Sequence, residues 1–310
     1  MTPTVSVVMA AKNYARFLPE AVESVLAQTF ADWELLVVDD GSTDATPAAV
    51  RPFLSHPRVR YVRSDVLGQS RAKNLGVRLS RGAFVAFLDA DDAWEPTKLE
   101  KQLALFDGRP GLGVAFCRRA LMDERGDPIA AGPAPAPPRG RVLDRMFVQN
   151  FVCFSSVVVR REAFSRAGAF DPQWDLAIDF DLWLRVARHY EFDYINEELV
   201  RYRTGHGNLS KKLLDRVDTA LSIKHRAATR YGAADHVPPD RVAEAYASTC
   251  RTLGYVLRNS EPVAAATWYA RALRWPTGRV ASLKGLVACA LRLASGRREP
   301  GSAENASANR

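Results

Sequence analysis

With 310 residues, the chain is long enough for one large or two small domains, and its apolar and charged contents are those of an ordinary globular protein. The net charge of +8 indicates anionic partners, and nucleic acid, an acidic membrane surface and a sugar diphosphate all meet that condition. The four cysteines stand far apart and form no CxxC pair, which argues against a zinc site or a disulfide framework.

Strand and helix patterns alternate through the first hundred residues. Their order is a strand at Val5–Ala11, a helix at 15–28, a strand at Glu34–Val38, a short helix from about Asp44, a strand at Val59–Arg63, a helix at 70–80, a strand at Ala83–Leu88 and a helix that begins near Pro96. This alternation predicts an α/β domain with a mainly parallel, Rossmann-like central sheet flanked by helices.

The second half of the chain is less regular. The stretch 123–141 is rich in proline and glycine and predicts a loop. After it we expect a strand at Ser155–Val159, a helix at Arg160–Ala167, a helix at about 179–190, two short strands up to Tyr202, helices from about 211 to 294, and a frayed tail at 295–310.

Two acidic clusters follow predicted strands. Asp39-Asp40 ends the second strand, and Asp89-Ala90-Asp91 ends the fourth. Ligands of such sheets bind at the carboxyl ends of the strands, so both clusters are expected to face one crevice. Crowded carboxylates repel one another unless a cation offsets them, and Mg²⁺ or Mn²⁺ shares such oxygen ligands with substrate phosphates.

Some of these polar residues also have simpler interpretations. Asp92 is the expected cap of the helix that follows, and Ser42 and Asp44 are typical turn or capping residues. A carboxylate at the end of the second strand, by contrast, can accept hydrogen bonds from a nucleotide base or ribose.

Several short motifs follow one another between about residues 3 and 210. They are Val5-Ser6-Val7-Val8-Met9 with Asn13-Tyr14, Val37-Val38-Asp39-Asp40-Gly41-Ser42-Thr43-Asp44, Gly68-Gln69-Ser70-Arg71-Ala72-Lys73-Asn74-Leu75-Gly76, Phe87-Leu88-Asp89-Ala90-Asp91-Asp92, Gly168-Ala169-Phe170-Asp171, Asp179-Phe180-Asp181-Leu182-Trp183-Leu184-Arg185 and Tyr202-Arg203. In this order they closely resemble the family 2 glycosyltransferases of GT-A fold. The resemblance does not cover the C-terminal third.

The resemblance implies a GT-A domain over residues 1–210, with a nucleotide-sugar half at about 1–115 and an acceptor half at about 140–210. A helical region at 211–294 and a disordered tail at 295–310 would follow. The implied reaction is an inverting transfer from a nucleoside-diphosphate sugar.

For the donor site, the resemblance implies that Asp40 holds the base, Asp89 lies at the ribose or the metal shell, and Asp91 binds a Mn²⁺ or Mg²⁺ that bridges the diphosphate. Ala10, Asn13 and Ala90 complete the expected donor site, with Lys12 beside the base pocket. Lys73 is expected to contact the nucleotide or its phosphates. The alternative is that Lys73 and Arg71 are both solvated surface charges on a helix.

For catalysis, Asp179 occupies the position of the family's general base, which takes the proton from the acceptor hydroxyl. Ile178 replaces the acidic neighbour of the commoner Glu-Asp pair, and Asp181 is a rival base with an expected structural role. His206 lies in a Gly-flanked loop and is a candidate metal or diphosphate ligand, with an ordinary loop histidine as the alternative. Trp174 is the candidate acceptor-stacking residue, whereas Trp183 is expected in the core.

The segment 271–298 carries seven basic residues and no acidic one, interleaved with leucine and valine. Such a helix either lies on an anionic membrane or packs on its own domain with a solvated basic face. The N-terminus lacks the features of a signal peptide, and no apolar run reaches the roughly 18 residues of a membrane span. We therefore expect a cytoplasmic protein, with peripheral membrane contact as an open alternative.

These observations together predict a metal-dependent inverting glycosyltransferase that uses a nucleoside-diphosphate sugar, with UDP favoured by family habit, on a glycan or lipid-linked saccharide of the cell envelope. One alternative is a sugar-nucleotide nucleotidyltransferase, although residues 10–14 lack its Gly-rich basic signature. Another is a non-catalytic sugar-nucleotide-binding homologue, which the joint presence of four carboxylates disfavours. No motif for nucleic-acid recognition is present.

Overall fold

The computed structural model describes residues 2–65, 67–132, 134–205 and 213–295. The chain divides into two compact units. The first, called here the sheet unit, comprises Met1–Val142 and Phe151–Asn208; the second, the helical unit, comprises Leu143–Asn150 and Leu209–Arg310. The segment Leu143–Asn150, which the sequence placed in the acceptor half, therefore belongs to the helical unit.

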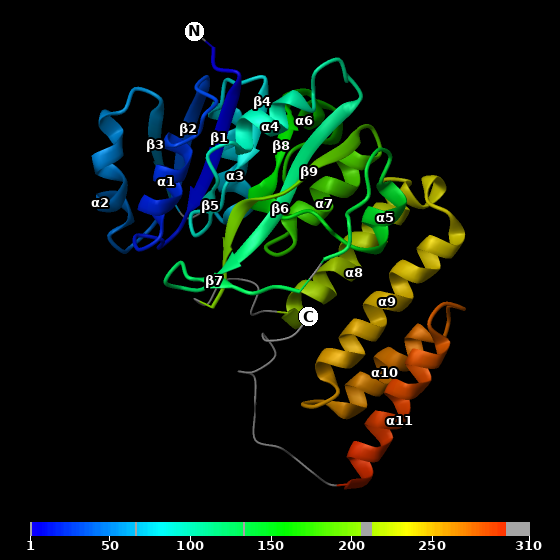
Figure 1. Ribbon diagram of the computed structural model, residues 1–310. Coiled ribbons are helices and arrows are strands. Elements are labelled where there is room, and N and C mark those ends of the chain that lie inside the picture. The colour runs from blue at the N-terminus through cyan, green and yellow to red at the C-terminus, as the bar shows by residue number, and fades with distance from the viewer. Residues whose placement is uncertain (1, 66, 133, 206–212, 296–310) are drawn as a thin grey trace. The chain divides into compact units, whose positions relative to one another are not determined.

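One mixed sheet forms the centre of the sheet unit, in the order β3-β2-β1-β4-β8-β6-β9-β5, with β7 paired to β6 (Figure 1). The first four strands in this order are parallel to one another, as the alternating sequence pattern predicted. Its strands are β1 (Val5–Ala11), β2 (Trp33–Asp40), β3 (Val59–Ser64), β4 (Phe84–Phe87), β5 (Ala93–Trp94), β6 (Leu112–Met122), β7 (Pro128–Ile129), β8 (Val158–Arg160) and β9 (Glu191–Arg203).

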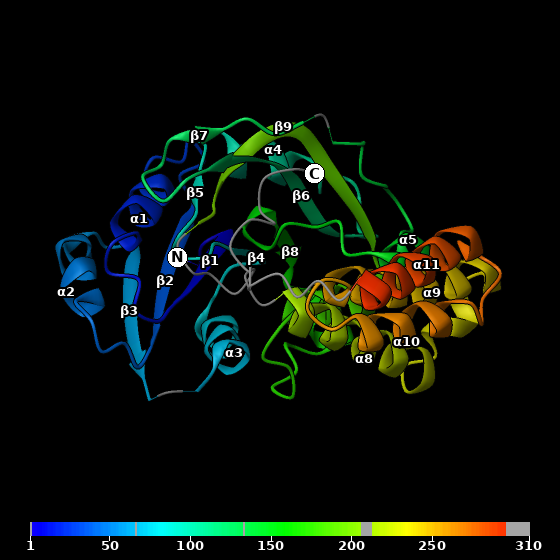
Figure 2. The ribbon, with the colours of Figure 1, turned by 90° about the horizontal axis from the view of Figure 1, so that it is seen from below.

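Helices cover both faces of the parallel strands (Figure 2). Helix α1 (Leu18–Leu26) packs its buried residues against alternate residues of β1 and β2, such as Val7 and Leu35. The other side chains of β2, such as Leu36, meet α3 (Gln69–Leu79). At Gly76 a Cβ atom would lie 2.3 Å from a methyl carbon of Val8, so only glycine lets α3 approach β1 this closely.

The remaining helices of the sheet unit are short. They are α2 (Thr46–Val50), the 3-10 helix η1 (Arg51–Ser55), α4 (Lys98–Ala104), the 3-10 helix η2 (Phe154–Ser156), α6 (Arg161–Ala167) and α7 (Ile178–Ala187).

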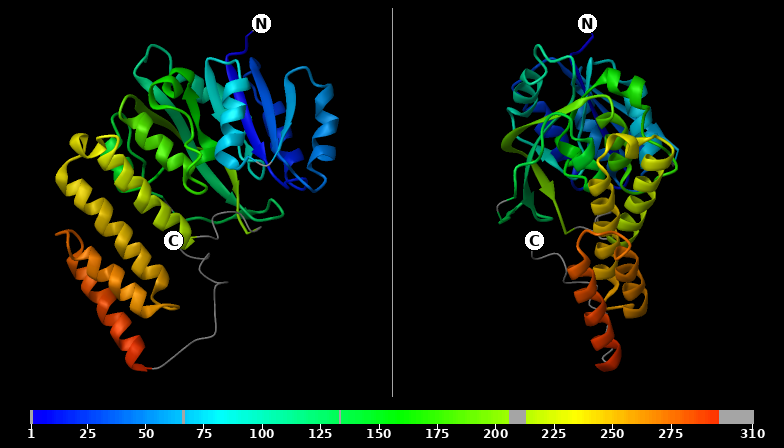
Figure 3. Two further views of the ribbon diagram at one scale, coloured as in Figure 1. Left: turned by 180° about the vertical axis from the view of Figure 1, so that it is seen from behind. Right: turned by 90° about the vertical axis from the view of Figure 1, so that its right-hand side faces the viewer.

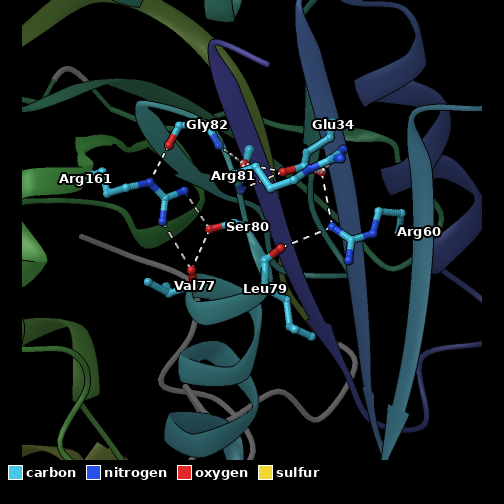
Figure 4. Close-up of polar contacts among 9 residues, drawn as sticks. Glu34, Arg60, Val77, Leu79, Ser80, Arg81, Gly82 and Arg161 are labelled. Carbon is cyan, nitrogen blue, oxygen red and sulfur yellow. Dashed lines mark hydrogen bonds and ion pairs between the residues drawn. The ribbon is translucent and has the colours of Figure 1, made fainter. Parts of the chain in front are cut away.

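At the amino ends of β1 and β2, a buried carboxylate ties several elements together (Figure 4). Glu34 is 2% exposed and accepts hydrogen bonds from the Arg81 Nε at 3.0 Å and from the Ser6 hydroxyl at 2.7 Å. Burial alone would raise the pKa of Glu34, but the hydrogen bonds and the charge of Arg81 lower that pKa below its ordinary value. This cluster stabilises the sheet at the end opposite to the candidate site.

The same region holds the C-terminal end of α3 (Figure 4). Arg161 donates to the Val77 carbonyl and Arg60 to the Leu79 carbonyl, at 3.4 and 3.1 Å. Both carbonyls belong to the last turn of α3, where main-chain acceptors lack partners within the helix and a positive charge is favourable. The N-terminus of α3 therefore points to the carboxyl ends of the strands.

The second half of the sheet corrects two predictions. Glu191–Arg203 forms one strand, not two, because its backbone pairs with β6 on both sides of a register shift, which lies where the exposed residues Asn196–Glu198 interrupt the apolar pattern. At 155–159, only β8 is a strand, because Phe154–Ser156 form the 3-10 helix η2, which is closed by the hydrogen bond from the Ser156 main-chain N–H to the Cys153 carbonyl at 3.0 Å. Strand β6 was not predicted, although Leu112–Cys117 is a buried apolar run, and β7 lies within the predicted loop.

The helical unit contains α5 (Leu143–Val148), α8 (Leu213–Thr229), the 3-10 helix η4 (Ala233–His236), α9 (Pro239–Leu257), α10 (Pro262–Ala272) and α11 (Arg279–Ser295) (Figure 3). Helix α9 packs against α5, α8, α10 and α11. The buried Lys224 joins three segments, because its ammonium donates to the Val148 carbonyl, the Ala245 carbonyl and the Thr249 hydroxyl. In the described part of the chain, no helix combines the length and apolar character needed to cross a membrane.

Candidate active site

The predicted donor residues gather where parallel strands end. Asp40 ends β2, Asn13 follows β1, and Asp89 follows β4. Since β1 pairs with both β2 and β4 in parallel, these three residues lie at one edge of the sheet. The structure thus gives both acidic clusters the common location that the sequence pattern predicted.

Asp89 and Lys73 form the central ion pair of this edge. The Lys73 ammonium lies 3.1 Å from the Asp89 carboxylate and 4.1 Å from the centre of the Phe154 ring. Lys73 is buried, so its alternative interpretation as a solvated surface charge is wrong, whereas Arg71 is exposed. The Asp89 side chain keeps 34% of its surface exposed, so a ligand can reach it.

Other carboxylates act on Asp89. Burial raises the pKa of the Asp89 carboxyl, the Lys73 charge opposes this rise, and the charges of Asp91 and Asp179 add to it. Asp179, from a distant part of the sequence, is therefore close enough to influence the strand end electrostatically. A bound cation would relieve this repulsion.

Asp92 does not cap a helix, which corrects the sequence interpretation. The strand β5 follows it, and α4 begins only at Lys98. Asp92 is 1% exposed and accepts hydrogen bonds from the Ser155 hydroxyl at 2.5 Å and the Arg203 main-chain N–H at 2.9 Å. Burial raises the pKa of Asp92 well above its usual range, and the charges of Asp91 and Asp89 raise it further.

Arg203 anchors the backbone of the acidic motif. Its guanidinium is 2% exposed and donates to the main-chain carbonyls of Asp91 at 2.8 Å and Asp123 at 3.1 Å, and it pairs with Glu20. A buried, always-charged fork of donors fixes several acceptors at once. The position of Asp91 is consequently set by the fold.

Asp40 is held by the loop before α3. Its carboxylate accepts main-chain hydrogen bonds from Leu67 at 2.6 Å and Gly68 at 3.1 Å, and Lys12 lies 3.9 Å away. Gly68 has a φ of +83°, a backbone conformation that favours glycine. The loop is thereby fixed beside the expected base pocket.

Asn13, the next predicted donor residue, connects two loops. It adopts a φ of +62°, its main-chain N–H donates to the Ser42 hydroxyl at 2.9 Å, and its side-chain oxygen accepts from the Thr43 main-chain N–H at 2.8 Å. Ala10 is half-buried on β1, while Ala90 is fully buried within the acidic motif.

The motif at the start of α3 positions a loop on the acceptor side. Asn74 forms a pair of hydrogen bonds with the main chain of Phe170, at 2.7 and 2.9 Å. The Ser70 hydroxyl donates to the Trp174 carbonyl at 3.0 Å, and Gln69 donates to the Asp175 carbonyl. Helix α3 thus fixes the loop that carries Trp174 and leads to Asp179.

Helix α7 carries both candidate bases. Asp179 is half-buried and lies in the first turn of the helix. Asp181 is 2% exposed and accepts two hydrogen bonds from Arg185, at 3.0 and 2.7 Å. Its carboxylate is therefore engaged in a buried ion pair. Trp183 is fully buried beside Phe192, as expected for a core residue.

Sequence reasoning assigned no role to three residues that shape this site. These residues are Arg203, Ser155 and Tyr14. Burial raises the pKa of the Tyr14 hydroxyl, and the charges of Asp91 and Asp89 raise it further. Tyr14 and Arg203 stand within the motifs that carry the family resemblance, and this position was the available signal. Nothing in the local pattern marks Ser155.

A divalent cation fits the chemistry of the strand end. Mg²⁺ and Mn²⁺ take oxygen ligands, and Mg²⁺ is commonly held by one or two carboxylates together with substrate phosphates. Asp89 and Asp91 supply such carboxylates. Within the residues that the structure describes, no group of three or more His, Cys, Asp or Glu side chains is placed to hold a metal. His206 lies outside the described residues.

The sequence matches the family model described as Glycosyl transferase family 2 over residues 6–168, which is more than half of the chain. The chain is a family 2 glycosyltransferase. Chondroitin synthase of Escherichia coli is 32% identical over 234 residues, which are 74% of this chain and 33% of that protein. An uncharacterized glycosyltransferase of Nostoc sp. is 32% identical over 207 residues, 64% of each chain. The matches thus span a third and just under two thirds of these relatives.

Solved structures show the same GT-A fold. S. aureus TarS 1-349 in complex with UDP has a TM-score of 0.58 at 13% identity, with 96% of this chain and 92% of that chain covered. The mannosyltransferase PcManGT from Pyrobaculum calidifontis, in complex with GDP-Man and Mn²⁺, has a TM-score of 0.56 at 20% identity, with 96% and 88% covered. The expected fold, including the helical C-terminal extension, is confirmed.

Proposed function

We propose that this family 2 glycosyltransferase moves a sugar from a nucleoside-diphosphate sugar, with UDP as the nucleotide, to a hydroxyl of a glycan or lipid-linked saccharide, with inversion at the anomeric carbon. The observation that carries this proposal is the acidic strand end at Asp89 and Asp91, bordered by Lys73 and influenced by the charge of Asp179. We place the reaction in cell-envelope polysaccharide biosynthesis. The nucleotide sugars in solved GT-A structures, UDP-GlcNAc and GDP-Man, support the donor class.

The proposed chemistry divides between donor and acceptor. Asp40 accepts a hydrogen bond from the base, Asp89 lies near the ribose, and Asp91 with His206 holds the Mn²⁺ or Mg²⁺. When bound, the cation neutralises charge on the leaving diphosphate. Lys73 adds a fixed positive charge beside Asp89.

On the acceptor side, Asp179 takes the proton of the attacking hydroxyl. The acceptor oxygen forms the new bond to the anomeric carbon while the bond from that carbon to the diphosphate oxygen breaks. Trp174, held by the main-chain contact to Ser70, stacks on the acceptor sugar. Asp181 is the less suitable base because Arg185 occupies its carboxylate.

Donor binding is tested by thermal unfolding with UDP-, GDP- and dTDP-sugars, each with and without Mn²⁺. A ligand at a hundred times its Kd stabilises the fold by about 2.7 kcal/mol. We expect a UDP-sugar with Mn²⁺ to give the largest shift. Asp91→Asn should abolish the Mn²⁺-dependent part of the thermal shift. The unliganded variant should be at least as stable as the wild type, since one repelling charge is removed.

Asp107→Asn is the matched control, because Asp107 is an exposed aspartate outside the site. It should retain the full Mn²⁺-dependent shift. If Asp91→Asn binds the donor in Mn²⁺ with unchanged affinity, Asp91 is not a ligand of the cation. Stabilisation by GDP- or dTDP-sugars alone would remove UDP as the proposed nucleotide.

We also propose that α11 contacts an anionic membrane. One face of α11 packs on its own unit and buries Ser282 and Cys289. Leu283, Val287 and Leu291 recur at every fourth position on another face and are 53%, 57% and 66% exposed. From Pro262 to Ser295 the chain has five basic residues and no acidic one. Exposed apolar residues among cations fit an anionic lipid surface.

Vesicle flotation with phosphatidylglycerol and with phosphatidylcholine tests this contact. The triple variant Leu283→Ser, Val287→Ser and Leu291→Ser should lose at least tenfold in binding to anionic vesicles. Val263→Ser, on α10 and 66% exposed, is the control and should bind as the wild type does. Absence of wild-type binding to anionic vesicles, or equal binding of the triple variant, would refute the membrane contact.

A further inference from the structure

The helical unit contains a cavity of about 480 Å³ that the proposed reaction does not use. Its volume is within the range of small-molecule sites, roughly 300–1,000 Å³. Helices α8, α9 and α10 and the residues just after α10 line it. The lining residues are Leu221, His225, Tyr246, Cys250, Trp268, Arg271, Arg274 and Trp275.

Aromatic rings form much of the wall. The ring of Trp275 stacks on that of Tyr246, with centroids 5.6 Å apart and planes 9° from parallel. Trp268 is half-buried and packs against a small apolar cluster of the same unit. These contacts fix the rings in place, so they offer rigid apolar surfaces at low entropic cost.

Positive charge borders the same cavity. Arg271 and Arg274 are exposed, and the Arg271 guanidinium lies 4.6 Å from the centre of the Trp268 ring. The buried Cys250 lies within reach of both arginine charges, since each lowers the pKa that burial raises. No carboxylate lines the cavity among the described residues.

We propose that this cavity binds an anionic saccharide unit of the acceptor glycan. Flat aromatic rings match the apolar C–H faces of a sugar ring, and an arginine fork matches a carboxylate, sulfate or phosphate. The inference rests on the proposed function, because a transferase that extends a glycan must hold its acceptor chain. A second binding site on the same polypeptide raises the effective concentration of the chain end.

The probe is a chondroitin tetrasaccharide, which carries uronate carboxylates, and its binding is measured by tryptophan fluorescence and calorimetry. Maltotetraose, inorganic phosphate and UDP are the comparison ligands. We expect the chondroitin tetrasaccharide to bind at least tenfold more tightly than maltotetraose. Arg271→Gln and Arg274→Gln should each weaken its binding about tenfold, as loss of a charge-assisted hydrogen bond does.

Arg230→Gln is the matched control, since Arg230 is an exposed arginine of the helical unit outside the cavity. It should bind the tetrasaccharide as the wild type does, and circular dichroism should show the same helix content in all variants. Equal losses in the control, equal affinity for maltotetraose, or tighter Arg274-dependent binding of phosphate or UDP than of the tetrasaccharide would each overturn the inference.

Donor binding in Mn²⁺, measured on the same proteins, separates the two proposals. If the donor binds and the tetrasaccharide does not, this inference fails and the proposed function stands. If the tetrasaccharide binds through Arg274 while no nucleotide sugar binds, the donor assignment fails and the saccharide site stands.

Discussion

At the scale of single residues, the acidic motif is held by partners from distant parts of the chain. Arg203 binds the Asp91 carbonyl, while Asp92 accepts from Ser155 and from the main chain of Arg203. These buried contacts exclude water and satisfy charged groups that would otherwise be costly. The motif is therefore placed before any ligand binds.

Ala177, like Asn13, has a backbone conformation that is unusual for a residue other than glycine. It directly precedes α7 and adopts the left-handed region, with a φ of +51°. A residue with a Cβ atom pays roughly 1–2 kcal/mol there, whereas glycine does not. We expect Ala177→Gly to leave the free energy of unfolding unchanged or to raise it by up to about 1 kcal/mol in chemical denaturation, because relief of strain offsets the greater entropy of glycine.

The same substitution at Ala104, in the last turn of α4, provides the comparison. Ala104 is helical and exposed, so Ala104→Gly should cost about 0.5–1 kcal/mol. A larger loss at Ala177 than at Ala104 would show that the left-handed conformation carries no strain.

At the scale of elements, α3 connects the two sides of the active site. Arginines bind carbonyls of its last turn, and its first turns hold the loop that precedes α7. Because both ends of α3 are fixed, the helix sets the position of Asp179 relative to the sheet. This contact is a structural role for the Gly-Gln-Ser-Arg-Ala-Lys-Asn motif.

Asn74→Ala should release that loop. Loss of the two hydrogen bonds to Phe170 should cost about 1–3 kcal/mol and loosen residues 170–177. We expect faster amide hydrogen exchange in that segment and a transfer rate at least tenfold lower, with nearly unchanged donor affinity. Arg78→Ala, at an exposed position of the same helix, should change neither quantity. Unaltered exchange in Asn74→Ala would contradict the positioning role.

The buried Lys98 of α4 makes the free energy of unfolding depend on pH. Burial lowers the pKa of Lys98 to about 8 from an ordinary 10.5. Between these values the unfolded chain binds more protons than the folded chain, so the free energy of unfolding rises with pH. The shift corresponds to a gain on the order of 3 kcal/mol between pH 8 and 10.5.

Urea denaturation of wild type and Lys98→Met across this range measures the effect. The advantage of wild type over the variant should grow as the pH rises, because only wild type has the titrating ammonium. Lys101→Met, at a half-exposed position of the same helix, should keep the wild-type slope. Parallel curves for wild type and Lys98→Met would contradict the assigned pKa direction.

At the scale of the whole molecule, the parallel first half of the sheet and the common edge of the acidic clusters followed from apolar runs and their spacing. Those signals are local, and parallel strands bring their ends together by topology alone. Contacts between distant segments left no such signal. Ser155 lies 63 residues from Asp92, its hydrogen-bond partner, and no periodic pattern joins them.

The irregular backbone pairing of β9 also left no signal in the sequence. The exposed residues in the middle of β9 interrupt the apolar pattern of one continuous strand, so sequence alone divided it. In the helical unit, the basic segment was visible in the sequence, whereas the exposed face of α11 became evident only when its packed face was known.

A comparison of three proteins tests whether the chain transfers a sugar with Asp179 as the base. Transfer rate and donor affinity are measured for wild type, Asp179→Asn and Asp175→Asn, the last an exposed aspartate of the neighbouring loop. Asp179→Asn should bind the UDP-sugar as the wild type does and transfer it about 10²–10⁴-fold more slowly, while Asp175→Asn should be unchanged. Transfer by Asp179→Asn at the wild-type rate would show that Asp179 is not the base.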